Sequence, residues 1–161
     1  DIFVTSASED GITRLRYDIG PAGQTLTATN ANTTLTGGAG ADLLTGLAGN
    51  DMLRGGAGED ILRDGAGSGT LFGGAGADIF VLARDGARDA IHDLEVGVDR
   101  LDLSGWDFLR SRAQLTFAIT ATGITVTYGD EVLVVNAADG KPTDHRVLSD
   151  ADLMGSARIP R

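Results

Sequence analysis

Five nonapeptides follow one another without insertion: GGAGADLLT (37–45), GLAGNDMLR (46–54), GGAGEDILR (55–63), DGAGSGTLF (64–72) and GGAGADIFV (73–81). We number them units 1 to 5. Apart from departures in units 2 and 4, they follow the pattern Gly-Gly-x-Gly-x-Asp-x-U-x, where U is a large apolar residue. Of the chain's 24 glycines, 14 lie in these 45 residues, so glycine is positional here and does not mark a flexible linker.

The nine-residue spacing predicts a parallel β-roll with two units per turn. Glycines at positions 1, 2 and 4 permit a tight turn with positive φ. The last three residues of each unit are too short for a helix and suit a short strand, in which position 8 points to one side and positions 7 and 9 to the other. The residues at position 8 must then share one interior; they are Leu44, Leu53, Leu62, Leu71 and Phe80.

The same phase continues upstream without the glycines. Leu35 lies nine residues before Leu44, and Leu26 lies nine residues before Leu35. We therefore interpret residues 19–36 as two degenerate rungs that cap the roll, because the ends of a stacked repeat need a cap. An ordinary threonine-rich edge strand is the alternative.

Position 7 distinguishes the two sheets of the roll. Units 1, 3 and 5 place Leu43, Ile61 and Ile79 on the outer face of one sheet, whereas units 2 and 4 place Met52 and Thr70 on the other. An apolar stripe on an outer face usually has a covering layer. We expect flanking strands to cover the stripe.

The aspartates at position 6 indicate calcium. Calcium takes six to eight oxygen ligands from carboxylates and backbone carbonyls, and one glycine-rich turn cannot supply that many. A site must therefore form between two stacked turns, which belong to units n and n+2. Units 1 and 3 would form a site with Asp42 and Asp60, and units 3 and 5 a second one with Asp60 and Asp78.

The opposite edge of the roll is expected to bind calcium less well. There Asp51 faces unit 4, which has Gly69 in place of the aspartate, and Asn30 and Asn32 could help Asp51 only weakly. Asp-Gly turns also occur in calcium-free solenoids, where the carboxylate bonds its own backbone. Five units in unbroken phase, four of them with the aspartate, favour calcium.

The segments after the roll predict further strands. Residues 89–106 are expected to form two strands around a tight turn at Gly97, capping the last rung. Three alternating segments predict an antiparallel meander; they are 115–120, 123–129 and 131–137. A short terminal helix is expected at 148–153, with Ser149 as its N-cap.

The predicted architecture is all-β and has three parts. Residues 28–81 form the roll and residues 82–161 form the capping strands and tail. Residues 1–27 are either the end of a preceding β-propeller blade, with a hairpin turn at Asp10–Gly11, or a further capping segment.

The nonapeptides resemble the RTX calcium-binding repeat. Together with DAIHDLEVGVDRLDLS (89–104), they resemble the C-terminal β-roll domain of serralysin-type secreted metalloproteases; similar modules occur in alginate epimerases and haemolysin-type toxins. The resemblance implies folding driven by calcium outside the cell, type I secretion, and no catalysis by this module. It places carboxylate ligands at Asp42, Asp51, Asp60 and Asp78. Carbonyls of the glycine loops would complete the shells; the candidates are Gly37, Ala39, Gly55, Gly56, Ala57, Gly58, Gly73, Gly74 and Gly76. Asp89, Asp93 or Asp99 would add a terminal site, or are solvated turn residues.

Composition narrows the partners. The net charge of −10 argues against nucleic-acid binding and suits a cation. There is no cysteine for disulfides or thiolate metal sites. No apolar run approaches the ~18 residues of a membrane span, and no secretory signal peptide is visible at the N-terminus.

No catalytic constellation is evident. The zinc-protease motif H-E-x-x-H is absent; His92 and His145 are interpreted as surface residues and Trp106 as a core or cap aromatic. Three functions remain open. The first is a secreted calcium-binding module that supports the folding of an attached passenger. The second is a carbohydrate-binding module, with Arg54, Arg63, Arg84 and Arg88 as candidates. The third is a surface-assembly protein joined by calcium.

Overall fold

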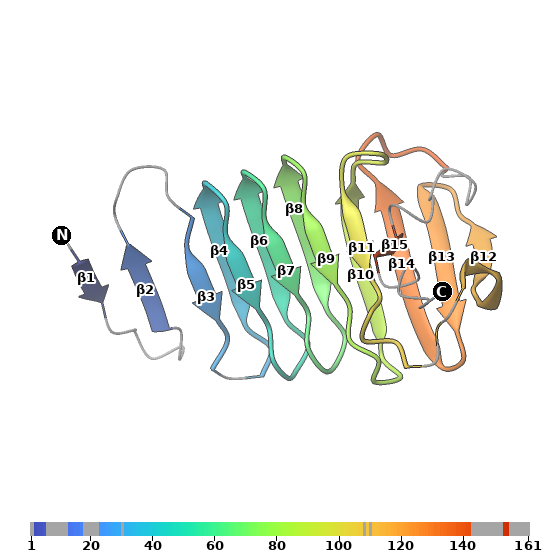
Figure 1. Cartoon of the computed structure of the whole chain (residues 1–161), viewed down its shortest axis with the longest axis horizontal. Coiled ribbons are helices and arrows are strands. Elements are labelled where there is room, and N and C mark those ends of the chain that lie inside the picture. Colours follow the sequence, from blue (N-terminus) through green and yellow to red (C-terminus); the bar gives the residue numbers. More distant parts are fainter. Residues whose placement is uncertain are drawn as a thin grey trace, which may run out of the picture.

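The computed structural model describes residues 2–5, 13–17, 23–29, 31–107, 109, 111–142 and 153–154. The chain winds through two β-sheets, whose strands are stacked along the long axis of the molecule (Figure 1). The strands of the amino-terminal segment lie at one end of this stack, and the meander lies at the other. The all-β class and the parallel β-roll predicted from the nonapeptides are confirmed.

Each sheet combines roll strands with flanking strands. The first sheet has the order β1 (Ile2–Thr5), β2 (Thr13–Tyr17), β3 (Thr25–Thr27), β5 (Leu43–Thr45), β7 (Ile61–Arg63), β9 (Ile79–Val81), β11 (Arg100–Asp102) and β15 (Leu153–Met154). The second has the order β12 (Thr116–Ile119), β13 (Gly123–Tyr128), β14 (Glu131–Ala137), β10 (Arg88–Leu94), β8 (Thr70–Ala75), β6 (Met52–Ala57) and β4 (Thr34–Ala39). The roll strands β3 to β11 pair in parallel, and β1 and β2 extend the first sheet by antiparallel pairing.

The core is a double ladder of apolar side chains between the sheets. The predicted upstream phase is confirmed, because Leu26 pairs with Leu44 and Leu35 pairs with Leu53, and all four side chains are buried. The first sheet contributes Leu26, Leu44, Leu62, Phe80 and Leu101; the second contributes Leu35, Leu53, Leu71, Ile91 and Val135. Each fully buried leucine or phenylalanine contributes about 1.5–3 kcal/mol of transfer free energy.

Residues 89–106 form two strands around a turn at Gly97, as predicted, but the two strands do not pair with each other. Strand β10 joins the second sheet beside β8, whereas β11 joins the first sheet beside β9, so the two strands form a further turn of the roll. The turn at Gly97, whose φ is 82°, carries the chain between the sheets. Each strand is held against the roll by an aspartate that accepts a hydrogen bond as the position-6 aspartates do. Asp89 Oδ1 accepts the N–H of Gly69, and Asp99 Oδ1 accepts the N–H of Asp78.

The meander is confirmed, and it is attached to the roll by a parallel pair. Strands β12, β13 and β14 are antiparallel neighbours, and β14 pairs in parallel with β10. The helix predicted at 148–153 falls mostly outside the described residues, but its last residue, Leu153, lies in strand β15. The described residues contain no α-helix, only the 3₁₀ turn η1 (Arg112–Gln114). Accordingly, the described part has no helix of the length and apolarity needed to cross a membrane.

The expected cover over the outer apolar stripe is not found in the described part. Leu43, Ile61 and Ile79 are half-buried. Every described strand belongs to one of the two sheets, so the flanking strands lengthen the sheets and form no third layer. Leu43 pairs with Ile61, and Ile61 pairs with Ile79, so the residues of the stripe shield part of one another's surface.

Candidate metal centres

The turns between the sheets form two stacks on opposite edges of the roll. We call the turns that lead from the second sheet into the first the first turn stack; they end at Asp42, Asp60, Asp78 and Asp99. The turns that lead from the first sheet into the second are the second turn stack; they cover 28–33, 46–51, 64–69 and 82–87. Figure 1 shows that the turns of each stack follow one another along the roll axis.

In the first turn stack, one oxygen of each position-6 aspartate holds the neighbouring turn. The backbone N–H of Asp42 donates to Asp60 Oδ1 over 2.7 Å, and that of Asp60 donates to Asp78 Oδ1 over 2.9 Å. The series extends to Asp99 Oδ1, which accepts from the N–H of Asp78 over 3.0 Å, and begins at Asp42 Oδ1, which accepts from the N–H of Gln24. The aspartates thereby fix the register of the stacked turns.

The second oxygen of each of these carboxylates is buried and has no hydrogen-bond partner. This is true of Oδ2 in Asp42, Asp60 and Asp78, whose side chains are all at most 2% exposed. Leaving a buried carboxylate oxygen without a donor is costly unless a cation neutralises it. These orphaned oxygens are what a bound cation would satisfy.

The first glycine of each unit leaves space beside the orphaned oxygen. A Cβ added at Gly37 would meet Asp42 Oδ2 and the carbonyl oxygen of Gly55; one added at Gly55 would meet Asp60 Oδ2 and the carbonyl oxygen of Gly73. Each cradle is thus walled by one carboxylate oxygen and one carbonyl oxygen from the next turn of the roll. Hard oxygen donors of this kind suit calcium, so the residues present fit the ion.

Burial raises the pKa of three carboxylates in this stack, those of Asp60, Asp78 and Asp99. For Asp60 burial is the main cause, opposed by the N–H of Asp42 and reinforced by the charge of Asp42. For Asp78 burial, together with the charges of Asp99, Asp60 and Asp93, raises the pKa to about 6. The pKa of Asp99 is raised mainly by burial as well. Without a cation, these groups repel one another in a poorly hydrated environment.

The other candidate donors have different roles. The carbonyl of Ala57 accepts the N–H of Gly40 over 2.7 Å, and that of Gly37 accepts the side-chain amide of Gln24 over 2.9 Å. Gly56, Gly58, Gly74 and Gly76 have positive φ, and a Cβ on any of them would collide with a carbonyl of the previous turn. These four glycines therefore permit the turns to stack. Ala39 lies exposed at the end of β4.

In the second turn stack, Asp51 has the same arrangement as Asp42. Its Oδ1 accepts the N–H of Thr33 over 2.7 Å, and its Oδ2 is buried and unpartnered. A Cβ at Gly46 would meet Asp51 Oδ2 and the backbone carbonyl of Asp64. The side-chain oxygen of Asn32 accepts the N–H of Asn50 over 2.8 Å. Asn30 lies outside the described residues.

Two further buried carboxylates in this stack were undervalued or missed by sequence reasoning. Asp64 and Asp89 are 3% and 2% exposed. Burial, reinforced by the charge of Asp89, raises the pKa of Asp64 to about 8. Burial, together with the charges of Asp85 and Glu131, raises the pKa of Asp89 to about 6. The signal in the sequence was that unit 4 lacks aspartate at position 6 but carries one at position 1.

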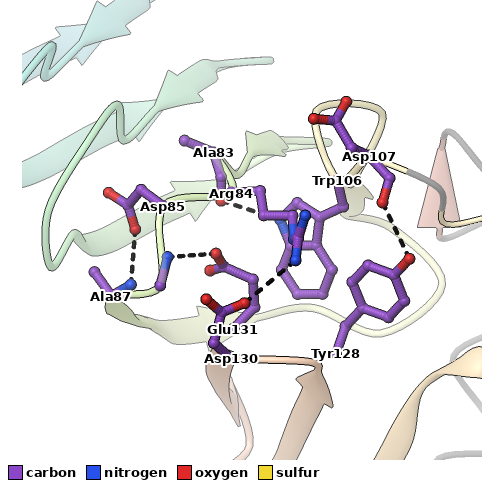
Figure 2. A network of polar contacts seen from close by, with 10 residues as sticks. Ala83, Arg84, Asp85, Ala87, Trp106, Asp107, Tyr128, Asp130 and Glu131 are labelled. Carbon is purple, nitrogen blue, oxygen red and sulfur yellow. Dashed lines mark hydrogen bonds and ion pairs between the residues drawn. The ribbon is translucent and has the colours of Figure 1, made fainter.

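A third buried carboxylate, Glu131, comes from the meander. Its Oε1 accepts the N–H of Gly86 over 2.5 Å, whereas its Oε2 is buried and unpartnered (Figure 2). Its neighbour Asp130 turns outward to Arg84, with 3.3 Å between the charged atoms. Trp106 lies beside this network and donates its indole N–H to the carbonyl of Ala83 over 3.1 Å. Trp106 is 2% exposed, as expected of a core aromatic.

The remaining sequence candidates are scattered. Asp93 accepts the N–H groups of Gly73 and Gly74. His92 is exposed and stacks on Phe72, whereas His145 lies outside the described residues. The four arginines do not line one groove: Arg54 lies in β6, Arg63 in β7 of the other sheet, Arg84 in a turn, and Arg88 at the start of β10. In the described part, no three histidine, cysteine or acidic side chains converge on a single metal position, so each cradle combines carboxylate with carbonyl oxygens.

Comparison with known proteins agrees with this geometry. Residues 27–62 and 54–85 match the family described as the RTX calcium-binding nonapeptide repeat. No curated protein matches the chain in sequence. Among solved structures, the chain is similar to the AlgE6R3 subunit of the mannuronan C5-epimerase of Azotobacter vinelandii, with 26% identity, a TM-score of 0.58 and coverage of 82% of each chain.

These matches support the resemblance at the level of the repeat and its fold. The solved structure is a module of an epimerase, so nothing ties the chain specifically to the serralysin-type proteases. The stacked turns and the repeat match lead to one conclusion: residues 27–85 fold as a β-roll and match the RTX calcium-binding nonapeptide repeat.

Proposed function

We propose that this chain is a non-catalytic module that folds when calcium fills its turn stacks and that supports the folding of an attached secreted protein. The observation that carries the proposal is the row of buried, unpartnered Oδ2 atoms on Asp42, Asp51, Asp60 and Asp78. RTX repeats typically occur in non-catalytic parts of secreted proteins.

Calcium acts as a switch in this proposal because the calcium-free roll is strained electrostatically. Its buried carboxylates lie next to one another, and the described ion pairs, Arg84–Asp130 and Lys141–Asp139, neutralise none of the position-6 aspartates. A ligand that binds only the folded state stabilises it by about 2.7 kcal/mol at 100 times its Kd. Extracellular calcium modules have Kd values of ~10⁻⁴–10⁻³ M. Such sites are empty in a cytosol and occupied outside the cell, which supports export as the setting.

Circular dichroism of the whole chain tests the switch. We expect a spectrum of low β-content in chelator and a gain of β-sheet signal at millimolar calcium. Magnesium at the same concentration is the control, because the smaller ion keeps its own water shell and would not produce the same gain. Identical spectra in chelator and calcium would contradict the proposal.

A second candidate function is the binding of an anionic polysaccharide. It is favoured by a stacked column on the outer face of the second sheet. The Arg54 guanidinium carbon lies 4.1 Å from the centre of the Phe72 ring, and that ring stacks on His92 with 4.8 Å between centres. Aromatic and guanidinium groups in one row offer a sugar both stacking and charge. The similar solved module belongs to an enzyme named for mannuronan.

A matched pair of arginines tests this second function. Arg54 and Arg63 both occupy position 9 and are exposed, but they lie on opposite sheets. We expect R54A to weaken the binding of mannuronan oligomers in calorimetry and R63A to leave it unchanged. Absence of binding by the unaltered chain, or equal losses in both variants, would reject this candidate.

A further inference from the structure

The second turn stack carries a ladder of side-chain hydrogen bonds at position 5 of its units. The backbone N–H of Asn50 donates to Asn32 Oδ1 over 2.8 Å, and the N–H of Ser68 donates to Asn50 Oδ1 over 3.0 Å. Each bond joins residues that are 18 apart, which is one full turn of the roll. Beside Ser68, the N–H of Gly67 donates to Asp85 Oδ2. Side chains therefore tie four successive turns of this stack together.

In the first turn stack, position 5 contributes no such ladder. Its residues there are Ala41, Glu59 and Ala77. Alanine has no polar side-chain atom, and the exposed Glu59 side chain has no hydrogen-bond or ion-pair partner within the described ranges. Successive turns are tied there by the position-6 aspartates, and each of these leaves a buried carboxylate oxygen without a partner. The second turn stack has bonds of the same reach from exposed, uncharged amides.

Ordering the backbone of the second turn stack also costs less entropy, because its turns contain fewer glycines. Turns 37–42, 55–60 and 73–78 of the first turn stack contain nine glycines, whereas turns 28–33, 46–51 and 64–69 of the second contain five. Glycine loses more conformational freedom on folding than any other residue. One residue opposes this trend, Leu47, whose φ is 71°. Asn32 has a φ of 60°, but asparagine adopts this region readily.

The position-6 residues of the two turn stacks differ in charge. In the second turn stack Asp51 lies between Thr33 and Gly69 at this position, so neither neighbouring turn presents a position-6 carboxylate. The acid of unit 4, Asp64, is at position 1, where its Oδ1 accepts two backbone N–H groups. In the first turn stack, by contrast, Asp60 lies between two position-6 carboxylates. Repulsion between successive position-6 carboxylates therefore opposes the closing of the first turn stack and is absent from turns 28–33, 46–51 and 64–69 of the second.

We propose that turns 28–33, 46–51 and 64–69 form a calcium-independent hinge of the roll. They keep their order when calcium is removed, because the position-5 ladder ties them together without a cation, whereas the first turn stack opens. Calcium then has to close only one edge of the roll. The inference rests on the proposed calcium switch, and it states which edge of the roll the ion closes.

Amide hydrogen exchange of the whole chain in chelator, resolved by NMR, tests the hinge. It compares N–H groups that each donate to a side chain one turn away, those of Asn50 and Ser68 in the second turn stack and those of Asp42 and Asp60 in the first. After correction for intrinsic rates, we expect exchange at Asn50 and Ser68 to be slower by about tenfold. Equal rates in chelator would overturn the inference. If calcium slows exchange at none of the four amides, the proposed function itself fails.

A matched pair of substitutions at position 5 tests the ladder itself. N50A removes the acceptor of the Ser68 N–H, whereas E59A truncates the side chain at the same position of the first turn stack. We expect N50A to speed the exchange of Ser68 in chelator by about tenfold and E59A to leave it unchanged. Circular dichroism in saturating calcium checks that both variants still fold. The same exchange rate at Ser68 in both variants would overturn the role of the ladder.

A gain of stability provides a test that misfolding cannot imitate. A41N/E59N places side-chain amides at position 5 of two successive turns of the first turn stack, where both residues are exposed. We expect this variant to fold at a calcium concentration lower by about threefold, because the new bonds stabilise the closed edge without the ion. A midpoint equal to or above that of the unaltered chain would also overturn the inference.

Discussion

At the scale of single residues, the two oxygens of each position-6 aspartate do different work. Oδ1 ties one turn to the next through a backbone N–H, whereas Oδ2 lies buried without a partner. The pattern in the sequence predicted that these aspartates are ligands, which stays a prediction, but it gave no sign that their two oxygens differ. It also could not reveal that the side chain of Asp64 lies beside Gly69, because that contact depends on how position 1 and position 6 meet in the folded turn.

Asp60 should matter more than Asp51 for calcium affinity. Asp60 lies between turns that both carry carboxylates, Asp42 and Asp78, whereas the turn after Asp51 has Gly69 at the same position. We expect D60N to raise the calcium concentration at the folding midpoint by about tenfold, equivalent to about 1.4 kcal/mol, and D51N to raise it less. A calcium titration followed by circular dichroism measures both midpoints. Equal shifts of the two midpoints would contradict the prediction that the first turn stack binds calcium more tightly than the second.

The stability of the calcium-free chain should fall as the pH rises. The pKa of Asp78 is raised from 3.8 to about 6 by burial, so the folded state holds its proton more tightly than the unfolded state. That contribution is fully present below pH 4 and is lost as the pH rises through 6. Circular dichroism in chelator at pH 4.5 and pH 7 checks this, with more β-sheet signal expected at pH 4.5. In calcium the trend should reverse, because protons compete with the ion for the same carboxylates.

At the scale of elements, the period of the apolar residues was the most reliable guide. Position 8 predicted the ladder through Leu44, Leu62 and Phe80, and it located the glycine-free rungs at Leu26 and Leu35. The two strands of 89–106 were predicted, but the sheet that each one joins was not, because two short strands with a glycine turn look the same in sequence whether they pair or separate. Strand β10 pairs with β8 and β11 pairs with β9, and these contacts are made with residues distant in the sequence.

Substituting two glycines with positive φ distinguishes the cost of backbone strain from the cost of disturbing the stacked turns. Gly97 has a φ of 82°, and a Cβ added there would have no other atom within 4 Å, so G97A should cost only the backbone strain of about 1–2 kcal/mol. Gly56 has a φ of 120°, and its Cβ would collide with the Gly38 carbonyl. G56A should therefore cost at least twice as much. Urea unfolding in saturating calcium measures the loss of unfolding free energy in both variants. Similar losses would contradict the expectation, because they would show that the stacked turns move apart to admit the Cβ.

At the scale of the whole molecule, the roll and the meander form one continuous core. The interior ladder runs from Leu71 through Ile91 to Val135 and then to Ile124. The sequence predicted both parts but not that β14 would pair in parallel with β10, because nothing local specifies that junction. A shared core implies that the two parts should gain and lose structure together.

Trp106 offers a direct measure of that coupling. It is the chain's single tryptophan, buried between the last turn of the roll and the meander, and its indole stacks on Tyr128 with 6.0 Å between the ring centres. We expect chelation of calcium to shift its fluorescence to longer wavelength, with the same midpoint as the circular dichroism change. A shift at a different calcium concentration would mean that the meander folds on its own.

The hydrogen bonds of the first turn stack give the molecule a direction. The N–H of Gln24, Asp42, Asp60 and Asp78 each donates to a carboxylate that lies further along the chain. The backbone N–H groups of Leu43, Ile61 and Ile79 run the other way, because they donate to the carbonyls of Gln24, Asp42 and Asp60 in the preceding turn. Each inner turn is thus held from both sides, so loss of order in one turn should speed amide exchange in both of its neighbours.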